Sequence, residues 1–230
     1  MIEASSILVV AAHPDDEVLG CGGMIARSVK EGHDVSIVIL GEGMTSRYSN
    51  REDTDRLKLK ELNAHCYAAG EILGVRNIHT FNLPDNQFDT VPLLEIVKIL
   101  ERIIETNRPD CVYTHHSCDL NIDHALTNRA TMIATRPLKE SPVKAVFSYE
   151  VSSSTEWAFQ TTGSSFKPNF FVDISETLDL KIEAMAQYTS ESRDFPHPRS
   201  EKSLRARAEM WGSVSGLKAA EAFELIRYIQ

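Results

Sequence analysis

Short apolar runs alternate with longer amphipathic stretches along the first two thirds of the chain. The short runs are nearly uninterrupted, which is typical of parallel strands covered on both faces. The longer stretches repeat apolar residues at helical spacing, most clearly between Leu93 and Ile104. The expected strands fall within residues 6–13, 34–43, 77–86, 110–116 and 144–151. The expected helices fall within residues 22–32, 54–74, 93–108 and 123–136.

This alternation of strands and helices predicts βαβ units. We therefore expect an α/β fold, a Rossmann-like three-layer sandwich with a mostly parallel central sheet. In such sheets, ligands bind at the carboxyl ends of the strands. We expect a single domain over residues 1–230, with the Rossmann-like core and the functional site in 1–150 and a substrate loop and C-terminal helices in 151–230.

The pattern changes after Val151. Residues 152–166 are rich in Ser and Thr and predict a long loop. Residues 168–188 predict a strand and then a helix that begins at a cap on Ser175. A second loop follows at 190–200, and the remainder favours a helix with a possible final strand.

Composition narrows the class of partner and the compartment. The 230 residues carry a formal net charge of −9, which argues against nucleic acid or an anionic membrane as a partner. The four cysteines include no C-x-x-C pair, so we expect reduced thiols. The N-terminal apolar run is cut short at His13, and neither a signal peptide nor a membrane span is visible. These features favour a cytoplasmic protein.

Polar residues gather directly after the first expected strand. His13, Asp15 and Asp16 follow the run "LVVAA", where burying like charges together is costly unless a cation lies among them. His13 and Asp16 are three residues apart on a turn, so both side chains can reach one metal ion. The segment continues into a glycine-rich turn, "GCGG" at 20–23, before the helix. These glycines do not form G-x-G-x-x-G, and we expect them to let the helix pack closely on the sheet.

A second polar cluster, "HHSCDLNIDH" at 115–124, ends the fourth expected strand. One of its histidines would complete a His-Asp-His set with the first cluster, since both lie at the same edge of the sheet. Three protein ligands leave one position open to water, as in catalytic zinc sites. Asp15, which is not needed as a ligand, could then take a proton from that water.

The motifs "AHPDDE" with "GCGG", "GEGMTSR", "LPDNQFD" and "DLNIDH" resemble those of the PIG-L/LmbE family of zinc-dependent N-acetyl-sugar deacetylases, over most of the chain. The resemblance implies an LmbE-like fold and a zinc site, in which iron, cobalt or manganese could replace zinc. It implies zinc ligands at His13, Asp16 and His124 and a general base at Asp15. It further implies that Asp123 orients a histidine or the site backbone, and that Arg47 contacts the substrate.

One position departs from the family pattern. Many members have a histidine three residues before the last zinc ligand, where it stabilises the oxyanion or protonates the amine. This chain has Asn121 there, which can donate a hydrogen bond but cannot deliver a proton. Asp15 would then carry both proton steps, or His116 or His197 would supply the acid. His197 lies between two prolines in a loop that could close over the site, in its own or a neighbouring subunit.

For several of these candidates, a structural role is an alternative to a role in the site. Asp85, in "LPDN", is either a turn former or a substrate contact, and Asp123 is also placed to cap a helix. His115 and His116 cannot both face the site, because successive strand residues point to opposite faces. We therefore take Asp15, Asn121, Asp123 and His197 as catalytic candidates, and Arg47, Asp85 and His116 as substrate contacts.

The function predicted from these residues is metal-dependent removal of an acetyl group from an N-acetylated amino sugar, glycoside or nucleotide-linked sugar. Two alternatives are hydrolysis of another amide or a phosphoester, and a non-enzymatic Rossmann-like module with a structural cation. We expect a small-molecule substrate, no nucleic-acid or membrane partner, and a homo-oligomer.

Overall fold

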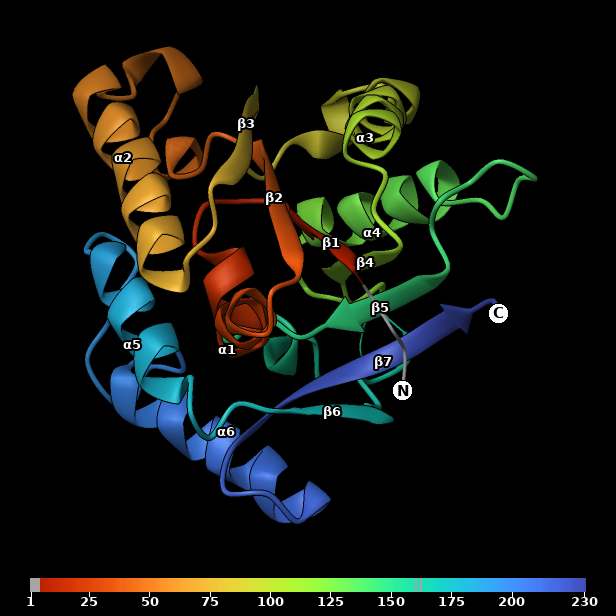
Figure 1. Cartoon of the computed structure of the whole chain (residues 1–230). Helices are drawn as coiled ribbons and strands as arrows, with labels where there is room; N and C mark the ends of the chain where they lie inside the picture. Colours follow the sequence, from red (N-terminus) through yellow and green to blue (C-terminus); the bar gives the residue numbers. More distant parts are fainter. Residues whose placement is uncertain (1–4, 160, 162) are drawn as a thin grey trace.

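A seven-stranded sheet runs through the middle of the molecule, and helices cover both of its faces (Figure 1). The computed structural model describes residues 5–159, 161 and 163–230. The strands are β1 (Ser6–Ala11), β2 (Asp34–Gly41), β3 (Asn77–Leu83), β4 (Cys111–His115), β5 (Ala145–Tyr149), β6 (Phe170–Asp173) and β7 (Ala220–Tyr228). Their order in the sheet is β3-β2-β1-β4-β5-β7-β6. The expected three-layer α/β fold is confirmed.

The helices follow the strands in the alternation that the sequence predicts. They are α1 (Asp16–Lys30), α2 (Arg56–Leu73), α3 (Leu93–Asn107), α4 (Ile122–Ala134), α5 (Leu178–Gln187) and α6 (Glu201–Ser215). Short 3-10 turns lie at Thr45–Arg47, Arg51–Asp53, Phe88–Thr90 and Glu156–Ala158. Gly74 ends α2 in the left-handed conformation at φ 80°, as expected for a glycine cap.

The five strands β1 to β5 are parallel, and β1 lies between β2 and β4. The chain winds from β1 outward through β2 and β3, then returns to place β4 on the other side of β1. The gap between the carboxyl ends of β1 and β4 is therefore the topological switch point, where ligands bind in this class of sheet. The C-terminal strands extend the same sheet, with β7 antiparallel to β5 and β6 antiparallel to β7.

Each face of the sheet has its own hydrophobic core. On one face, α1, α2 and α5 pack over β1 and β2, with Leu19, Met24, Leu73 and Met185 buried between them. On the other face, α3 and α4 pack over the same strands (Figure 1). Burying both faces explains why the central strands read as unbroken apolar runs.

The expected glycine-rich turn at 20–23 is helical instead, because α1 begins at Asp16. The helix tolerates glycines here because neighbouring side chains pack against its backbone. A Cβ on Gly20 would lie 2.2 Å from the Tyr149 ring, and one on Gly23 would lie 2.7 Å from Ile174. The expectation of close packing was therefore right, although the turn was wrong.

The cap expected at Ser175 is also wrong. Helix α5 begins at Leu178, with Thr177 at the N-cap position. Ser175 instead donates its backbone N–H and its hydroxyl to Asp173 Oδ1, at 2.9 and 2.6 Å, which forms a turn before the helix.

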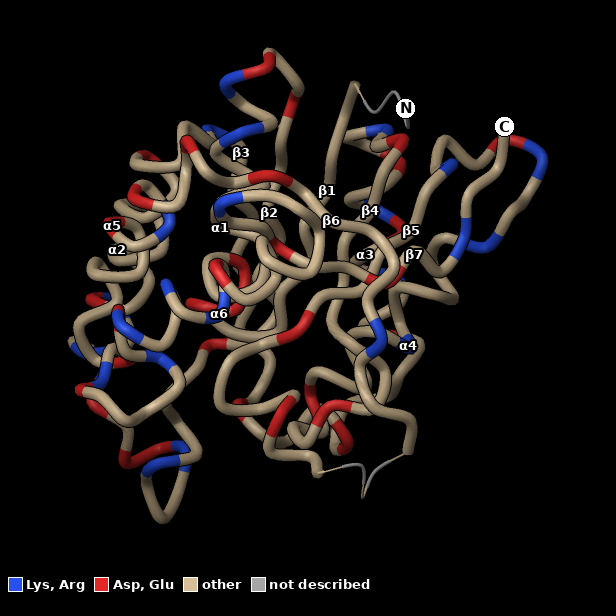
Figure 2. The backbone as a smooth tube through the Cα atoms, turned by 90° about the horizontal axis from the view of Figure 1, so that it is seen from below, with Lys and Arg blue, Asp and Glu red and all other residues tan. Residues whose placement is uncertain are grey.

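Acidic and basic residues are interspersed along the backbone (Figure 2). Within the described residues, none of the helices combines the length and the hydropathy needed to cross a bilayer. Cys21, Cys66 and Cys111 are buried free thiols.

Candidate metal centre

The first polar cluster lies at the switch point of the sheet. His13 follows β1 directly, and Asp16 is the first residue of α1. His124 lies in the first turn of α4, which follows β4 after a short connection. The sheet order places the ends of β1 and β4 side by side, so residues 108 or more positions apart in the chain meet at one edge.

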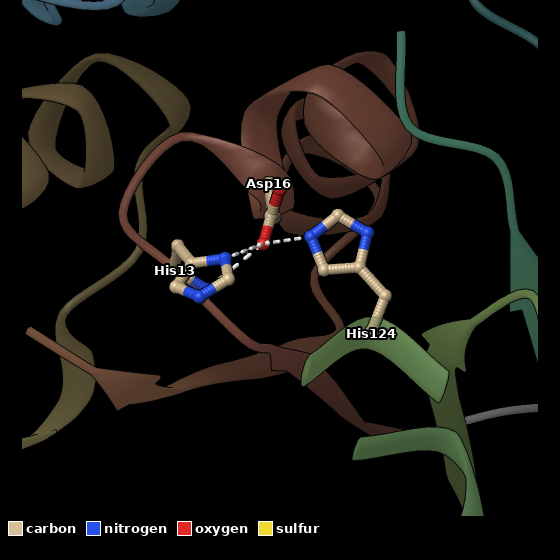
Figure 3. A group of neighbouring side chains, drawn as sticks. All are labelled: His13, Asp16 and His124. Atoms are coloured by element: carbon tan, nitrogen blue, oxygen red, sulfur yellow. Dashed lines mark hydrogen bonds and ion pairs between the residues drawn. The ribbon is translucent and has the colours of Figure 1, made fainter. Parts of the chain in front are cut away.

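His13, Asp16 and His124 converge on one point (Figure 3). Asp16 Oδ2 lies 3.5 Å from His13 Nδ1 and 3.3 Å from His124 Nε2. The three ligand atoms all lie within 4.8 Å of one another, and the residues are almost fully buried. The backbone N–H of His13 donates to the same carboxylate oxygen at 2.8 Å, which fixes the turn between the two residues.

A further carboxylate holds each imidazole from behind. His13 Nε2 lies 2.8 Å from Asp123 Oδ2, and His124 Nδ1 lies 3.1 Å from Asp119 Oδ1. Such carboxylates select the histidine tautomer and orient the ring, so that the opposite nitrogen keeps its lone pair for a metal ion. His13 thus offers Nδ1 to the site, and His124 offers Nε2.

Asp123 is itself held rigidly by the backbone. Its oxygens accept hydrogen bonds from Asn86 N at 2.6 Å and Phe88 N at 2.9 Å. Within the described residues, a second group of possible ligand atoms combines His13, Asp85 and Asp123. Because backbone amides already occupy both oxygens of Asp123, this group is better suited to orienting His13 than to holding a second ion.

Charge in the cluster favours a cation. Burial disfavours protonation of His13, but its hydrogen bonds with Asp123 and Asp16 outweigh burial and raise its pKa well above the ordinary value. Burial likewise opposes protonation of His124, yet Asp16 and Asp119 raise its pKa to about 9. Burial would raise the pKa of Asp16, but the neighbouring imidazoles of His124 and His115 hold it well below the ordinary value.

The same residues fit a divalent metal ion. Two imidazole nitrogens and one carboxylate oxygen face each other in a buried pocket rich in negative charge, and both rings are oriented by second carboxylates. The raised pKa values of His13 and His124 favour protonated imidazoles beside the carboxylates in the metal-free chain. Metal binding would displace those protons, as is usual for sites built from histidine.

Asp15 stands beside the triad without belonging to it. It occupies the N-cap position of α1, but its side chain makes no capping hydrogen bond. Its backbone is left-handed, at φ 105°, a conformation that costs energy for a residue with a side chain and often marks functional sites. Burial raises the pKa of Asp15 well above its ordinary value, although the guanidinium of Arg199 opposes this.

A cavity of about 190 Å³ opens over the triad. The triad, Asp15, Arg47, Asp85 and Asn121 all line it, so the structure brings seven of the ten candidates together. Asp85 accepts hydrogen bonds from the backbone N–H and the hydroxyl of Ser46, at 3.0 and 2.6 Å. Arg47 Nη2 pairs with Glu191 Oε2 at 2.5 Å. The eighth candidate, Asp123, lies behind His13 rather than in the cavity.

Asn121 lies at the cavity but serves as the N-cap of α4. Its side-chain oxygen accepts a hydrogen bond from Asp123 N at 2.8 Å. The side chain is therefore tied to the start of the helix, which limits how its amide group can turn toward a substrate.

His116 and His197 do not line this cavity. His116 faces a separate cavity of about 310 Å³, where Nδ1 lies 2.9 Å from Glu224 Oε2 and Nε2 lies 3.1 Å from the Ser164 carbonyl. Its neighbour His115 points the other way and stacks on His124 with 4.1 Å between ring centroids. His115 is fully buried behind the triad, with its Nε2 3.6 Å from Asp16 Oδ2, and it does not line the cavity either.

The loop that carries His197 does approach the site, through a different residue. The His197 ring packs edge-on against Trp157 and accepts a hydrogen bond from Arg199 N at 3.1 Å. Arg199 lines the cavity and donates to Asp15 Oδ2 at 2.6 Å. Sequence reasoning missed Arg199 and Glu191, because no local spacing links them to the motifs. The only signal was the proximity of Arg199 to His197. Asp119 lies within the second polar cluster, but the sequence assigned it no separate role.

Comparison with known proteins identifies the family of this chain. A family model described as PIG-L, GlcNAc-PI de-N-acetylase, matches residues 8–135, more than half of the chain. The chain belongs to the PIG-L family. The matched segment contains the triad, Asp15 and both carboxylates that hold the histidines.

Relatives of this PIG-L protein differ in activity. Diacetylchitobiose deacetylase of Thermococcus kodakarensis is 25% identical over 227 residues, which cover 97% of this chain and 84% of the relative. The 4-oxalmesaconate hydratase of Pseudomonas putida is 27% identical over 190 residues, which cover 78% and 71%. Among solved structures, N,N'-diacetylchitobiose deacetylase of Pyrococcus horikoshii matches with a TM-score of 0.77 at 22% identity, over 98% of this chain and 85% of that one.

Proposed function

We propose that this PIG-L protein is a zinc-dependent N-deacetylase that removes the acetyl group from an N-acetylated amino sugar, either free, glycosidic or linked to a nucleotide. One observation carries the proposal. The buried set His13, Asp16 and His124 shares its cavity with Asp15, a carboxylate outside the set that is free of any capping role. Relatives named as deacetylases of acetylated sugars support the choice of substrate.

His13, Asp16 and His124 would hold the zinc ion. When bound, zinc supplies a Lewis acid that polarises a carbonyl group and lowers the pKa of water. Asp15 takes a proton from the attacking water as the water oxygen adds to the acetyl carbon. The C–N bond then breaks, and Asp15 returns the proton to the departing nitrogen. The products are a free amine and acetic acid, which loses its proton to solvent to become acetate, and Asp15 ends ionised as it began.

The remainder of the cavity suits a polar substrate. Ser46, Asp85, Asn86 and Ser153 line it together with Arg47, and these side chains present both donors and acceptors to sugar hydroxyls. Arg47 and Asp85 are therefore proposed as substrate contacts. Self-association and a cytoplasmic location, together with the division at residue 150, stay predictions from the sequence.

The test is a screen of N-acetylated amino sugars, their glycosides and nucleotide sugars with the purified, zinc-loaded chain. Amine and acetate are both measured, and equal amounts of the two are expected. A chelator should abolish release, and added zinc should restore it. Asp15→Asn should lower kcat by about 10²–10⁴-fold while the zinc content stays unchanged. Asp89→Asn, at an exposed position outside the cavity, is the control.

Two results would overturn the proposal. The first is zinc-loaded protein that releases no acetate from any member of the screen. The second is full activity of Asp15→Asn. Because one relative is a hydratase, the screen also includes an unsaturated dicarboxylate and a phosphate monoester. Turnover of either compound without acetate release from any sugar would assign the site to another reaction.

A further inference from the structure

The cavity holds few groups that can stabilise negative charge on a substrate. Hydrolysis of an acetamide places that charge on the former carbonyl oxygen, and fixed donors aimed at it are usually the largest electrostatic contribution to catalysis. His13 and His124 are committed to the metal, and Asn121 is neutral and tied to Asp123 N. Among the described lining residues, Arg47 and Arg199 are the other carriers of positive charge.

Of these two arginines, Arg199 is the better placed. The Arg47 side chain is 43% exposed, whereas that of Arg199 is 21% exposed. A charge acts more strongly where water is excluded, because the local dielectric is lower. Arg199 Nη1 also lies 2.6 Å from Asp15 Oδ2, so its guanidinium adjoins the space in which water must meet Asp15.

Arg199 is held by several hydrogen bonds and still has N–H donors that these bonds do not use. Its Nε donates to Ser153 Oγ at 2.8 Å, and its Nη1 contacts both Asp15 and, at 3.2 Å, Glu191. Within the part of the chain that the structure describes, Nη2 has no hydrogen-bond partner. The side chain is therefore held by three partners at the edge of the cavity, and the N–H groups of Nη2 remain available to an oxygen that gains charge.

We propose that Arg199 is a catalytic residue that donates a hydrogen bond to the acetyl oxygen as that oxygen becomes an anion. The inference rests on the proposed deacetylation. As water oxygen bonds to the carbonyl carbon, the carbonyl electron pair moves onto the acetyl oxygen, beside Arg199. As the C–N bond breaks, the pair returns and the nitrogen takes the proton held by Asp15. Arg199 keeps its own protons throughout, since guanidinium does not titrate in this range.

The first test compares Arg199→Ala with Arg199→Lys in zinc-loaded protein. Arg199→Ala should lower kcat by about 10²–10³-fold with KM within about threefold. Arg199→Lys keeps the charge but loses the planar fork, so its loss should be smaller. Zinc content should match that of the wild type. Arg193→Ala is the matched control, because Arg193 lies in the same loop, is exposed, and donates to the carbonyls of Ser190 and Ser192.

A structural role would produce a different pattern. Free guanidinium ion should restore part of the activity of Arg199→Ala, whereas a misplaced loop would not respond. With an N-trifluoroacetyl substrate, whose oxyanion is intrinsically stabilised, the defect should shrink by about tenfold. Calorimetry gives a readout without turnover. A methylphosphonamide analogue of the tetrahedral state should bind Arg199→Ala about 100-fold more weakly, while the amine product binds unchanged.

The outcomes separate the two proposals. An inactive wild type would overturn the deacetylase and this role together. An active wild type with full kcat in Arg199→Ala would overturn the role of Arg199 alone. So would a defect confined to KM, an equal defect on acetyl and trifluoroacetyl substrates, or equal loss of affinity for the analogue and the product.

Discussion

Asp123 holds His13 in place at the rim of the sheet. Its Oδ2 lies 2.8 Å from His13 Nε2, and its two oxygens also accept the backbone amides of Asn86 and Phe88. The segment after β3 thereby fixes an imidazole that follows β1. The segments that follow β1, β3 and β4 therefore act together to orient the His13 ring before any metal ion is bound.

Asp123→Asn should therefore weaken metal binding. The amide cannot hold the His13 N–H as a carboxylate does, so the ring loses its fixed tautomer and orientation. Loss of such a partner typically lowers metal affinity by about 10–100-fold. Competition with a chromophoric chelator measures the zinc affinity, and Asp89→Asn is the control on a nearby exposed acid. An unchanged affinity in Asp123→Asn would show that His13 is oriented by other contacts.

Metal removal should lower stability. Zinc binds the folded site and not the unfolded chain, so zinc at 100 times its Kd adds about 2.7 kcal/mol to the free energy of unfolding. The melting temperature of chelated protein should rise when zinc is returned. His124→Ala should lose most of this rise, whereas His79→Ala should keep it, because His79 lies on β3 away from the cavity. A rise of equal size in both variants would place the ion elsewhere.

The sequence sufficed for the fold because its main signals are local. The apolar runs of β1 and β4 and the apolar face of α3 can each be recognised within one element. Because the carboxyl ends of parallel strands lie at the same edge of a sheet, His13 after β1 is then expected close to the cluster after β4 that contains His124. Residues 13–16 lie within one turn, so their proximity needed no tertiary information. Even so, the helix was expected to begin at Gly22, and the helical state of Gly20 and Cys21 was missed, because the packing that favours glycine at position 20 comes from Tyr149.

What could not be predicted depends on how the C-terminal third returns to the sheet. Arg199 meets Asp15 across 184 positions, and Glu191 meets Arg47 across 144. Nothing in the spacing of these residues signals such contacts. For the same reason, His197 was a reasonable candidate from its loop. The loop does reach the cavity, but it presents the guanidinium two residues later.

Gly20→Ala should destabilise the fold. Its Cβ would lie 2.2 Å from the Tyr149 ring, whose hydroxyl donates to the Val10 carbonyl at 2.8 Å, so the ring cannot move freely. Overpacking of this kind costs about 1–3 kcal/mol. Gly22→Ala is the milder comparison, because the nearest atom, Lys181 Cγ, is 3.1 Å away and alanine favours a helix. Urea unfolding measures both, and equal stability of the two variants would contradict the packing argument.

His116 should make stability depend on pH through its contact with Glu224. Burial lowers the pKa of His116, but Glu224 and the Ser164 carbonyl outweigh burial and raise it above its ordinary value. A histidine with a raised pKa stabilises the fold fully below its unfolded pKa of about 6.5, and that contribution is lost as pH rises through the folded value. The pKa of Glu224 is lowered, against the effect of burial, by His116 and by Lys167 N. Its contribution is therefore lost only as the pH falls through that lowered value.

The stabilisation from this pair is thus greatest near pH 6, just below the unfolded pKa of His116, and it declines as the pH is raised above that value in a series from pH 6 to 9. His116→Gln removes the charge, so the difference in unfolding free energy between wild type and variant should shrink over that interval. We expect this difference to fall by about 1 kcal/mol. A buried hydrogen bond between charged groups contributes more than this, but Glu224 is partly exposed to solvent, which weakens the interaction. His33→Gln is the control, because His33 lies 3.6 Å from Glu31 at the surface and should show little change. If the wild-type and His116→Gln stabilities stayed a constant distance apart from pH 6 to 9, the His116–Glu224 contact would not be an ion pair.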